Sequence, residues 1–195
     1  MRSDIAVVIL AGGEGKRIGG GKPLLRFRGE RLVDRAIRLA SRWSDLVAIS
    51  VRDAAQVQPT GVRVIIDEPG VEGPLGGLFS ALLFGADAGR DFMLNIPADM
   101  LFLPSDLLDG LQTGIGECAC ALGSSGGHLH PVCGLWRTSA LDRIGTYLAG
   151  DRRSLKGFAA LVGFREVEWG SGSMDPFFNI NTPEDLAEAS SRSAD

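Results

Sequence analysis

The chain has 195 residues, of which 45% are hydrophobic and 23% charged, and its formal net charge is −4. This length and composition are typical of one globular domain spanning residues 1–195, and the negative balance argues against a nucleic-acid partner. No apolar stretch is long enough to predict a membrane span and no secretory signal precedes the first predicted strand, so we expect a cytoplasmic protein without a membrane partner.

Short strands alternate with amphipathic helices over the first half of the chain. Strands rich in branched or aromatic residues are predicted at Ala6–Leu10, Leu46–Val51, Val62–Ile66 and Phe92–Ile96. Helices with one apolar face are predicted between them, at Leu32–Trp43 and Leu75–Ala88. This order predicts an α/β fold, a three-layer α/β/α sandwich with a Rossmann-like, mostly parallel sheet covered on both faces.

The second half of the chain is less regular. Strands are predicted at Ala119–Leu122, Pro131–Trp136 and Phe164–Trp169, and helices at Ser139–Leu148 and Leu155–Leu161. The last helix has the clearest start, with Thr182 as the N-cap and Pro183 at the first helical position. The tail 190–195 is predicted to be disordered.

The first strand runs directly into a glycine-rich loop, Ala11–Pro23, which carries Arg17 and Lys22. Glycines let the main chain approach an anion closely, and successive N–H groups can form an anion-binding concavity, so the loop is predicted to bind phosphate. Its spacing is not that of a P-loop, because the required first glycine falls on Lys16 and Pro23 replaces the hydroxyl residue. It also lacks the third glycine of the dinucleotide fingerprint. A flexible surface loop is the alternative.

Two aspartates, Asp67 and Asp99, lie just beyond the carboxyl ends of predicted strands. The carboxyl ends of parallel strands share one edge of a sheet, so both are expected near the glycine-rich loop. We hypothesise that Asp99 binds Mg²⁺, which takes one or two carboxylates together with substrate phosphates; a turn or cap is the alternative for each aspartate. The segment Gly73–Leu78 is predicted either to lie against a nucleobase or sugar, or to allow close helix–sheet packing.

The cysteines and histidines do not predict a metal site or a disulfide. Cys118, Cys120 and Cys133 are odd in number, and the first two lack metal-finger spacing. His128 and His130 lie in a stretch rich in Gly and Ser with no third ligand nearby. We therefore expect small buried thiols and no zinc.

Further motifs extend the pattern along nearly the whole chain. They are Gly73-Pro74-Leu75, Pro97-Ala98-Asp99, His130-Pro131, Tyr147-Leu148-x-x-Asp151-Arg152-Arg153, and the run from Asn179 to Leu186 that reads NINTPEDL. With the opening loop, this ordered set resembles the molybdenum cofactor guanylyltransferase (MobA-type) family of nucleotidyltransferases. The resemblance implies a nucleotide-diphospho-sugar transferase-like fold. It also implies Mg²⁺-dependent transfer of GMP from GTP to the terminal phosphate of molybdopterin with release of pyrophosphate, and contacts with molybdoenzyme-assembly proteins.

The resemblance also implies site residues. Arg17, Lys22 and Asp99 would be catalytic, Asp99 would hold the metal, and Asn179 and Asn181 would lie toward the pterin. The nucleotide would contact Leu10, Ala11, Gly12, Gly13, Lys22, Ser50, Asp67 and Asp99. Because an incoming phosphate is already a nucleophile, no activated Ser or Cys is needed, and catalysis would rest on alignment and charge neutralisation.

The chain departs from the family pattern at four positions. Ile18 stands where the family usually has Met, Gly21 where it has Asp, Leu101 where it has Pro, and Ser50 where an Asn is frequent. Gly12 favours the guanine-using branch, since cytidine-using relatives more often have Ala there. The alternatives are CTP with molybdopterin, a different phosphorylated acceptor such as a sugar phosphate, and a non-catalytic nucleotide-binding module.

Overall fold

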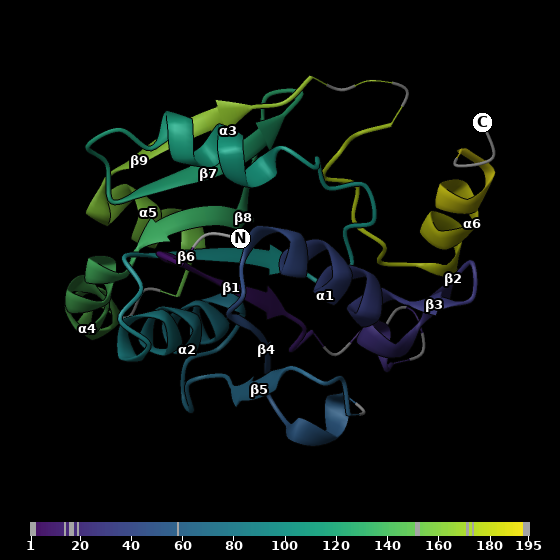
Figure 1. Ribbon diagram of the computed structural model, residues 1–195, viewed down its shortest axis with the longest axis horizontal. Coiled ribbons are helices and arrows are strands. Elements are labelled where there is room, and N and C mark those ends of the chain that lie inside the picture. The colour runs from purple at the N-terminus through teal and green to yellow at the C-terminus, as the bar shows by residue number, and fades with distance from the viewer. Residues whose placement is uncertain are drawn as a thin grey trace.

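The chain folds around a seven-stranded sheet of order β5-β4-β1-β6-β8-β7-β9 (Figure 1). The computed structural model describes residues 3–13, 15, 18, 20–57, 59–150, 153–170, 172 and 174–192. The strands of this sheet are β1 (Ile5–Leu10), β4 (Val47–Val51), β5 (Arg63–Ile66), β6 (Phe92–Pro97), β7 (Cys120–Ser125), β8 (His128–Arg137) and β9 (Phe164–Glu168). Only β8 is antiparallel to its neighbours in this sheet, β6 and β7, which confirms a mostly parallel sheet.

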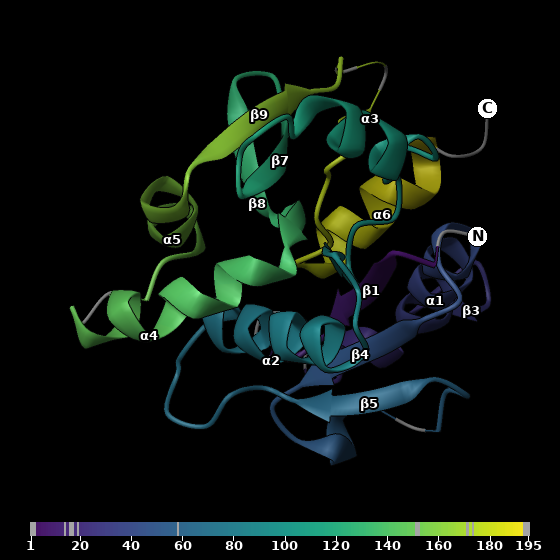
Figure 2. The ribbon, with the colours of Figure 1, turned by 60° about the vertical axis from the view of Figure 1, so that its left-hand side comes forward.

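Helices cover both faces of the sheet, so the predicted three-layer sandwich is confirmed (Figures 1 and 2). They are α1 (Leu32–Trp43), α2 (Pro74–Asp87), α3 (Leu107–Gly114), α4 (Leu141–Ala149), α5 (Leu155–Val162) and α6 (Pro183–Arg192), with 3₁₀ turns η2 (Lys22–Leu24), η3 (Ala54–Gln56) and η4 (Thr138–Ala140). Alternation along β1 supplies both cores: Ile5, Val7 and Ile9 pack with α1 and α3, and Ala6 and Val8 with α2, α4 and α5. No helix among the described residues combines the length and apolar character needed to cross a membrane.

A small hairpin of β2 (Arg26–Phe27) and β3 (Glu30–Arg31) forms a third core with the C-terminal helix α6. Its buried members are Phe27, Leu32, Ile180 and Ala189. In Figure 1, α6 and the hairpin lie at the same side of the molecule. Residues 27–32 therefore pack against residues 180–189, which brings the segment before α6 close to the opening loop.

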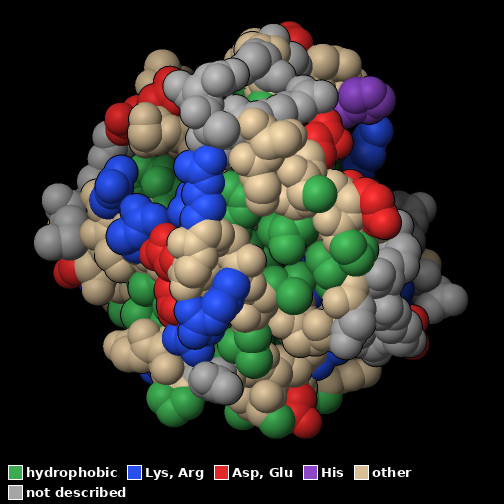
Figure 3. Space-filling view, turned by 90° about the vertical axis from the view of Figure 1, so that its right-hand side faces the viewer, with side chains coloured by type: hydrophobic (Ala, Val, Ile, Leu, Met, Phe, Trp, Pro, Cys, Tyr) green, Lys and Arg blue, Asp and Glu red, His purple; other side chains and the backbone are tan. Residues whose placement is uncertain are grey.

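Arginines are concentrated on the hairpin and α1. Figure 3, a view of the side where these elements lie, shows Lys and Arg side chains grouped around acidic ones. Glu30 accepts from Arg38 at 2.9 Å and from Arg35 at 3.4 Å, and Asp34 pairs with Arg31 at 2.6 Å. Much of this positive charge is therefore paired within the protein.

Helix α3 has no counterpart in the sequence analysis. Two of its eight residues are glycines, Gly110 and Gly114, which disfavour a helix on propensity. Both glycines have a packing role, because a Cβ at Gly110 would lie 2.6 Å from the ring of Trp169, and one at Gly114 would overlap Val167. Close contact between α3 and β9 thus outweighs the poor intrinsic propensity.

Three predicted boundaries were wrong by three or more residues. Strand β7 ends at Ser125 and not at the predicted Leu122. Strand β8 begins at His128, three residues before the predicted Pro131, because its first residues pair with the extended end of β7 beyond a bulge at Leu122/Gly123. Helix α6 continues to Arg192, so the predicted disordered tail does not begin at residue 190. Buried Ala189 anchors this last turn, and the Ser190 hydroxyl donates to the Leu186 carbonyl at 2.7 Å. Residues 193–195 lie outside the described part of the chain.

The carboxyl ends of four parallel strands meet at one edge of the sheet. Register places Leu10 of β1 beside Ser50 of β4 and Pro97 of β6. The chain segments that leave these strands continue the hydrogen bonding, since Ala98 N donates to the Leu10 carbonyl at 3.1 Å and Asp67 N to the Val51 carbonyl at 2.8 Å. The predicted site residues that follow these strands therefore lie on a single edge.

Candidate active site

Lys22 is the residue at which the predicted site comes together. Its Nζ donates to Asn181 Oδ1 at 2.8 Å and to Asn179 Oδ1 at 3.3 Å, and forms an ion pair with Asp99 Oδ2. The Lys22 side chain is only 11% exposed. The structure thus joins the opening loop, the end of β6 and the segment before α6, which lie far apart in the sequence.

The turn before Lys22 explains one departure from the family pattern. Gly21, at φ 59° and ψ 28°, has the left-handed conformation and precedes the 3₁₀ turn η2. Glycine adopts this conformation without strain, and aspartate is among the few other residues that tolerate it. Glycine can therefore provide the turn that brings Lys22 toward Asp99.

The segment that carries Asn179 and Asn181 is held by backbone bonds. Ile180 N donates to the Asp99 carbonyl at 3.0 Å, and Asn179 forms a β-bridge with Met100. The predicted N-cap is confirmed: Thr182 Oγ1 accepts from Asp185 N at 3.2 Å, and Asp185 Oδ2 accepts from Thr182 N at 2.8 Å and from Asn181 N at 2.7 Å. The start of α6 thus fixes Asn181 directly.

Asp99 is a buried carboxylate with one oxygen in use and one without a partner. Burial raises the pKa of Asp99, and the charge of Lys22 acts in the opposite direction. Oδ2 pairs with Lys22, whereas Oδ1 is buried without a hydrogen-bond partner. No cluster of three or more His, Cys, Asp or Glu side chains that could hold a metal occurs among the described residues. A single carboxylate oxygen suits Mg²⁺, which draws its remaining ligands from water and substrate phosphates.

Ser50 and Asp67 form a second polar pair at the same edge. Ser50 Oγ donates to Asp67 Oδ1 at 2.5 Å. Burial raises the pKa of Asp67, while the bond from Ser50 and the charge of Arg52 lower it. Gly12 leaves room for this carboxylate, because a Cβ there would lie 2.5 Å from Asp67 Oδ2.

A Gly12→Ala variant is expected to bind GTP, the nucleotide that the resemblance implies, about 5- to 100-fold more weakly, because overpacking costs about 1–3 kcal/mol. The added methyl group would displace the Asp67 carboxylate or the Arg52 backbone. Titration calorimetry with GTP measures the effect. Gly13→Ala is the matched control, since its Cβ would meet nothing within 4 Å. Equal GTP affinity in the Gly12→Ala and Gly13→Ala variants would contradict the proposal that Gly12 makes room for the Asp67 carboxylate.

A cavity of about 190 Å³ lies between these groups. Its wall includes seven of the predicted residues: Leu10, Gly12, Gly13, Ser50, Asp67, Asp99 and Asn179. Ala11 and Lys22 line a smaller adjoining cavity of about 30 Å³ with Leu10, Gly13 and Asp99. Arg17 lies outside the described residues, so its role stays a prediction.

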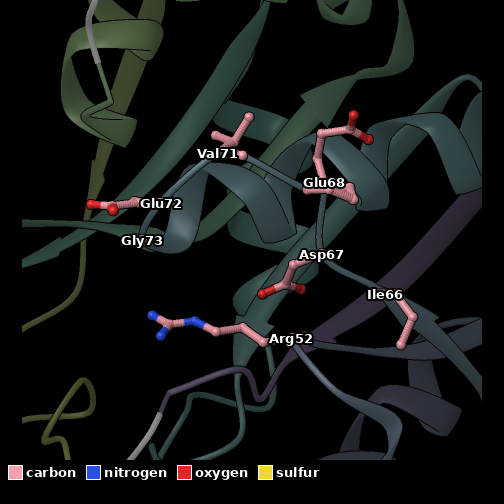
Figure 4. Close-up of a pocket in the computed structure, with 9 residues that line it drawn as sticks. Arg52, Ile66, Asp67, Glu68, Val71, Glu72 and Gly73 are labelled. Carbon is pink, nitrogen blue, oxygen red and sulfur yellow. The ribbon is translucent and has the colours of Figure 1, made fainter.

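A larger hollow of about 510 Å³ adjoins this cavity, and the two share Arg52, Asp67 and Gly73. Figure 4 shows Arg52 reaching toward the side where Glu72 and Gly73 lie, with the Asp67 carboxylate between the strand ends and Glu68 pointing the other way. No motif in the sequence indicated Arg52 or Glu72. Arg52 directly follows β4, two residues after Ser50. This position at the carboxyl end of a parallel strand could have indicated Arg52 as a site residue.

The glycines that open α2 allow close packing, which is one of their two predicted uses, whereas contact with a nucleobase or sugar stays a prediction. Gly76 serves packing, since a Cβ there would lie 2.5 Å from the Val71 carbonyl oxygen. Gly73 and Gly77 line the smaller cavity, and a Cβ at Gly77 would lie 3.1 Å from Leu10 Cδ2. The start of α2 therefore both packs closely and forms part of the cavity wall.

Comparison with known proteins shows the family of this chain and agrees with the fold. Residues 7–163 match the family described as the MobA-like NTP transferase domain. A protein from Rhodopseudomonas palustris (strain BisB5) named molybdenum cofactor guanylyltransferase is 42% identical over 190 residues, 93% of this chain and 90% of the relative. One of the same name from Cereibacter sphaeroides is 39% identical over 186 residues, 94% of each chain. The crystal structure of molybdopterin-guanine dinucleotide biosynthesis protein A from Archaeoglobus fulgidus has a TM-score of 0.77 at 21% identity, covering 97% of this chain and 98% of that one.

Proposed function

The chain belongs to the MobA-like NTP transferase family and is a nucleotidyltransferase, and from this premise we propose that it transfers GMP from GTP to the terminal phosphate of molybdopterin. A phosphate oxygen of the acceptor would bond to the α-phosphorus of GTP as the bond to the β-phosphate breaks, and pyrophosphate leaves. The observation that carries the proposal is the meeting of Lys22 with Asp99, Asn179 and Asn181.

In this reaction the protein's work is alignment and charge neutralisation, because the nucleophile comes with the acceptor. The glycine loop would hold the triphosphate through its backbone N–H groups, and Lys22 would offset negative charge where the two phosphates meet. We propose that Asp99 Oδ1, buried without a partner, holds Mg²⁺. Such an ion supplies further positive charge to phosphate oxygens.

The hollow between Arg52 and Glu72 is the place we propose for the guanine. Arg52 can donate to guanine O6 and N7, the commonest side-chain reading of this base. A carboxylate such as Glu72 can accept from the N1–H and the 2-amino group. The hollow opens beside Asp67 and Gly73, which also line the smaller cavity, so a nucleotide could span both.

The acceptor side of the proposal rests on Asn179 and Asn181. Their side-chain amide oxygens accept from Lys22 Nζ, so a second phosphate could approach Lys22 beside them. The names of the relatives indicate molybdopterin as the acceptor. We further propose a cytoplasmic location, where GTP is available, and transfer of the product to molybdoenzyme-assembly proteins.

Pyrophosphate release is the direct test of the proposed function. The protein is incubated with Mg²⁺ and molybdopterin together with GTP, ITP, ATP or CTP, and pyrophosphate and the dinucleotide product are measured. We expect turnover with GTP and weaker turnover with ITP, which lacks the 2-amino group. A preference for CTP would overturn the base assignment. No pyrophosphate with any nucleotide would overturn the proposed activity.

An Arg52→Ala variant is expected to reduce GTP affinity and the preference for GTP over ATP by about 5- to 100-fold, because a good bidentate contact contributes about 1–3 kcal/mol of base discrimination. Calorimetric titration with both nucleotides measures the two quantities. Arg165→Ala, on the exposed surface of β9 at the far edge of the sheet, is the control. An unchanged ratio of the two affinities would remove Arg52 from base recognition.

A further inference from the structure

Ser125, His130 and Asp175 form a polar cluster that the proposed reaction does not use. Ser125 ends β7 and is 1% exposed, and His130 belongs to β8. Ser125 Oγ lies 2.7 Å from Asp175 Oδ1 and 3.0 Å from His130 Nε2. Asp175 belongs to the segment that leads to Asn179 and Asn181.

The direction of these hydrogen bonds excludes a nucleophilic serine. A hydroxyl has one proton, and an ionised carboxylate can only accept, so Ser125 donates to Asp175. The contact with His130 must then be Nε2–H donating to Ser125 Oγ. Burial lowers the pKa of His130, which favours the neutral ring, and the hydrogen bond to Ser125 places the single N–H of that ring on Nε2. In a serine nucleophile the hydroxyl proton would point to the histidine instead.

The cluster also fixes Phe177, whose ring packs the segment 175–181 against its neighbours. Asp175 Oδ1 accepts from Phe177 N at 2.9 Å, which closes a tight turn. The Phe177 ring is 2% exposed, stacks on His130 with centroids 4.6 Å apart, and meets Trp169 edge-on at 5.7 Å. Gly123 leaves the space for this ring, because a Cβ there would lie 2.7 Å from it. His130 therefore contacts the segment directly through its ring and indirectly through its hydrogen bond to Ser125, which in turn bonds to Asp175.

The segment 175–181 is thus held at both ends. Asp185 and Thr182 fix its end at α6, and the Ser125 cluster fixes its start on β7 and β8. Between them, Asn179 and Asn181 meet Lys22, and Ile180 N bonds to the Asp99 carbonyl. A shift at Phe177, two residues before Asn179, would carry directly into the contacts of Lys22.

We propose that His130, Ser125 and Asp175 are positioning residues for the transfer reaction, which set the path of the segment 175–181 and so the placement of Asn179 and Asn181 on Lys22. The inference rests on the proposed function. The hollow assigned to the base is lined by Arg52 and residues 66–73, and of the segment 175–181 Asn179 alone lines the smaller cavity that the rest of the nucleotide would enter. Loss of the cluster should therefore impair turnover far more than GTP binding.

Ser125→Ala removes the central hydroxyl and is expected to lower kcat about 10- to 100-fold, since a displacement of about 1 Å can cost about 100-fold. GTP affinity, measured by calorimetry, should change less than about threefold. Ser124→Ala is the matched control, because Ser124 is also fully buried on β7 but donates to the Val167 carbonyl at 3.3 Å and not to this segment. The control should lose stability without a comparable loss of kcat.

Three further variants separate the hydrogen bonds from simple packing. Asp175→Asn keeps an acceptor oxygen and should retain most activity, whereas Asp175→Ala should behave like Ser125→Ala. His130→Phe keeps a ring over Phe177 but loses the N–H, so it should lower kcat at nearly unchanged melting temperature. Equal losses in Asp175→Asn and Asp175→Ala, or wild-type kcat in both Ser125→Ala and His130→Phe, would overturn the proposal.

Hydrogen exchange provides a readout that does not depend on activity. The amide of Ile180 should exchange faster in Ser125→Ala than in wild type or Ser124→Ala, because its bond to Asp99 depends on the path of the segment. Unchanged exchange at residues 175–181 would overturn the positioning role even if the enzyme used another substrate. Absence of GTP turnover in the wild type, with the exchange result as expected, would overturn the proposed function alone.

Discussion

Replacing Lys22 with Met is expected to lower kcat about 1,000-fold, the loss typical when a preorganised charge-stabilising donor is removed from an active site. Lys22 Nζ contacts Asp99, Asn179 and Asn181, so the variant loses its positive charge and the contacts that hold the three side chains together. Steady-state measurement of pyrophosphate release with GTP, Mg²⁺ and molybdopterin gives the value. The apolar Met chain fits the part-buried path of the lysine, which limits any effect on folding.

Lys156→Met is the control for this experiment. Lys156 is exposed on α5, on the face of the sheet covered by α2 and α4, and touches none of the predicted site residues. Its replacement changes the net charge by the same amount. Surface substitutions usually change the free energy of unfolding by about 0.5 kcal/mol or less, so kcat should stay within about twofold of wild type. Similar losses in the two variants would show that net charge, and not the position of Lys22, accounts for the effect.

Asp99→Asn is expected to lower kcat about 100- to 1,000-fold and to raise the Mg²⁺ concentration needed for half-maximal rate. The substitution keeps the size of the side chain but removes the charge that would bind the ion and pair with Lys22. The fold should survive, because Ile180 N bonds to the backbone carbonyl of Asp99 and not to its carboxylate. Rates measured across a series of Mg²⁺ concentrations separate the loss of metal affinity from the loss of turnover.

Two comparisons make the Asp99 result interpretable. Asp142→Asn, at an exposed position in the first turn of α4, should leave both the rate and the Mg²⁺ dependence unchanged. In the Lys22→Met/Asp99→Asn double variant, the loss should be much smaller than the product of the single losses, because the two groups act as a unit. An unchanged rate in Asp99→Asn would contradict the metal assignment, and multiplicative losses would contradict the coupling.

Much of the fold could be predicted from local pattern. The run Ala6–Leu10 is a strand because branched apolar residues suit a strand that is buried on both faces, and β1 spans Ile5–Leu10. Helix α1 could be found because its apolar residues recur at helical spacing. Helix α3 could not, because Gly110 and Gly114 make room for Trp169 and Val167, which are more than fifty residues away in the chain.

The sequence by itself determined where the proposed donor side of the site lies. The strand, the glycines and the two aspartates indicate phosphate binding at one sheet edge, because parallel strands place their carboxyl ends together. The resemblance added Asn179 and Asn181, but only the tertiary structure brought them to Lys22, 157 and 159 residues earlier in the chain. It also decided that Arg52 borders the larger hollow, and that Ser125, His130 and Asp175 share one cluster. The physical reason is that hydrogen bonds between side chains far apart in the sequence depend on how the sheet and the helices pack. Local residue patterns do not specify which remote side chains this packing brings together.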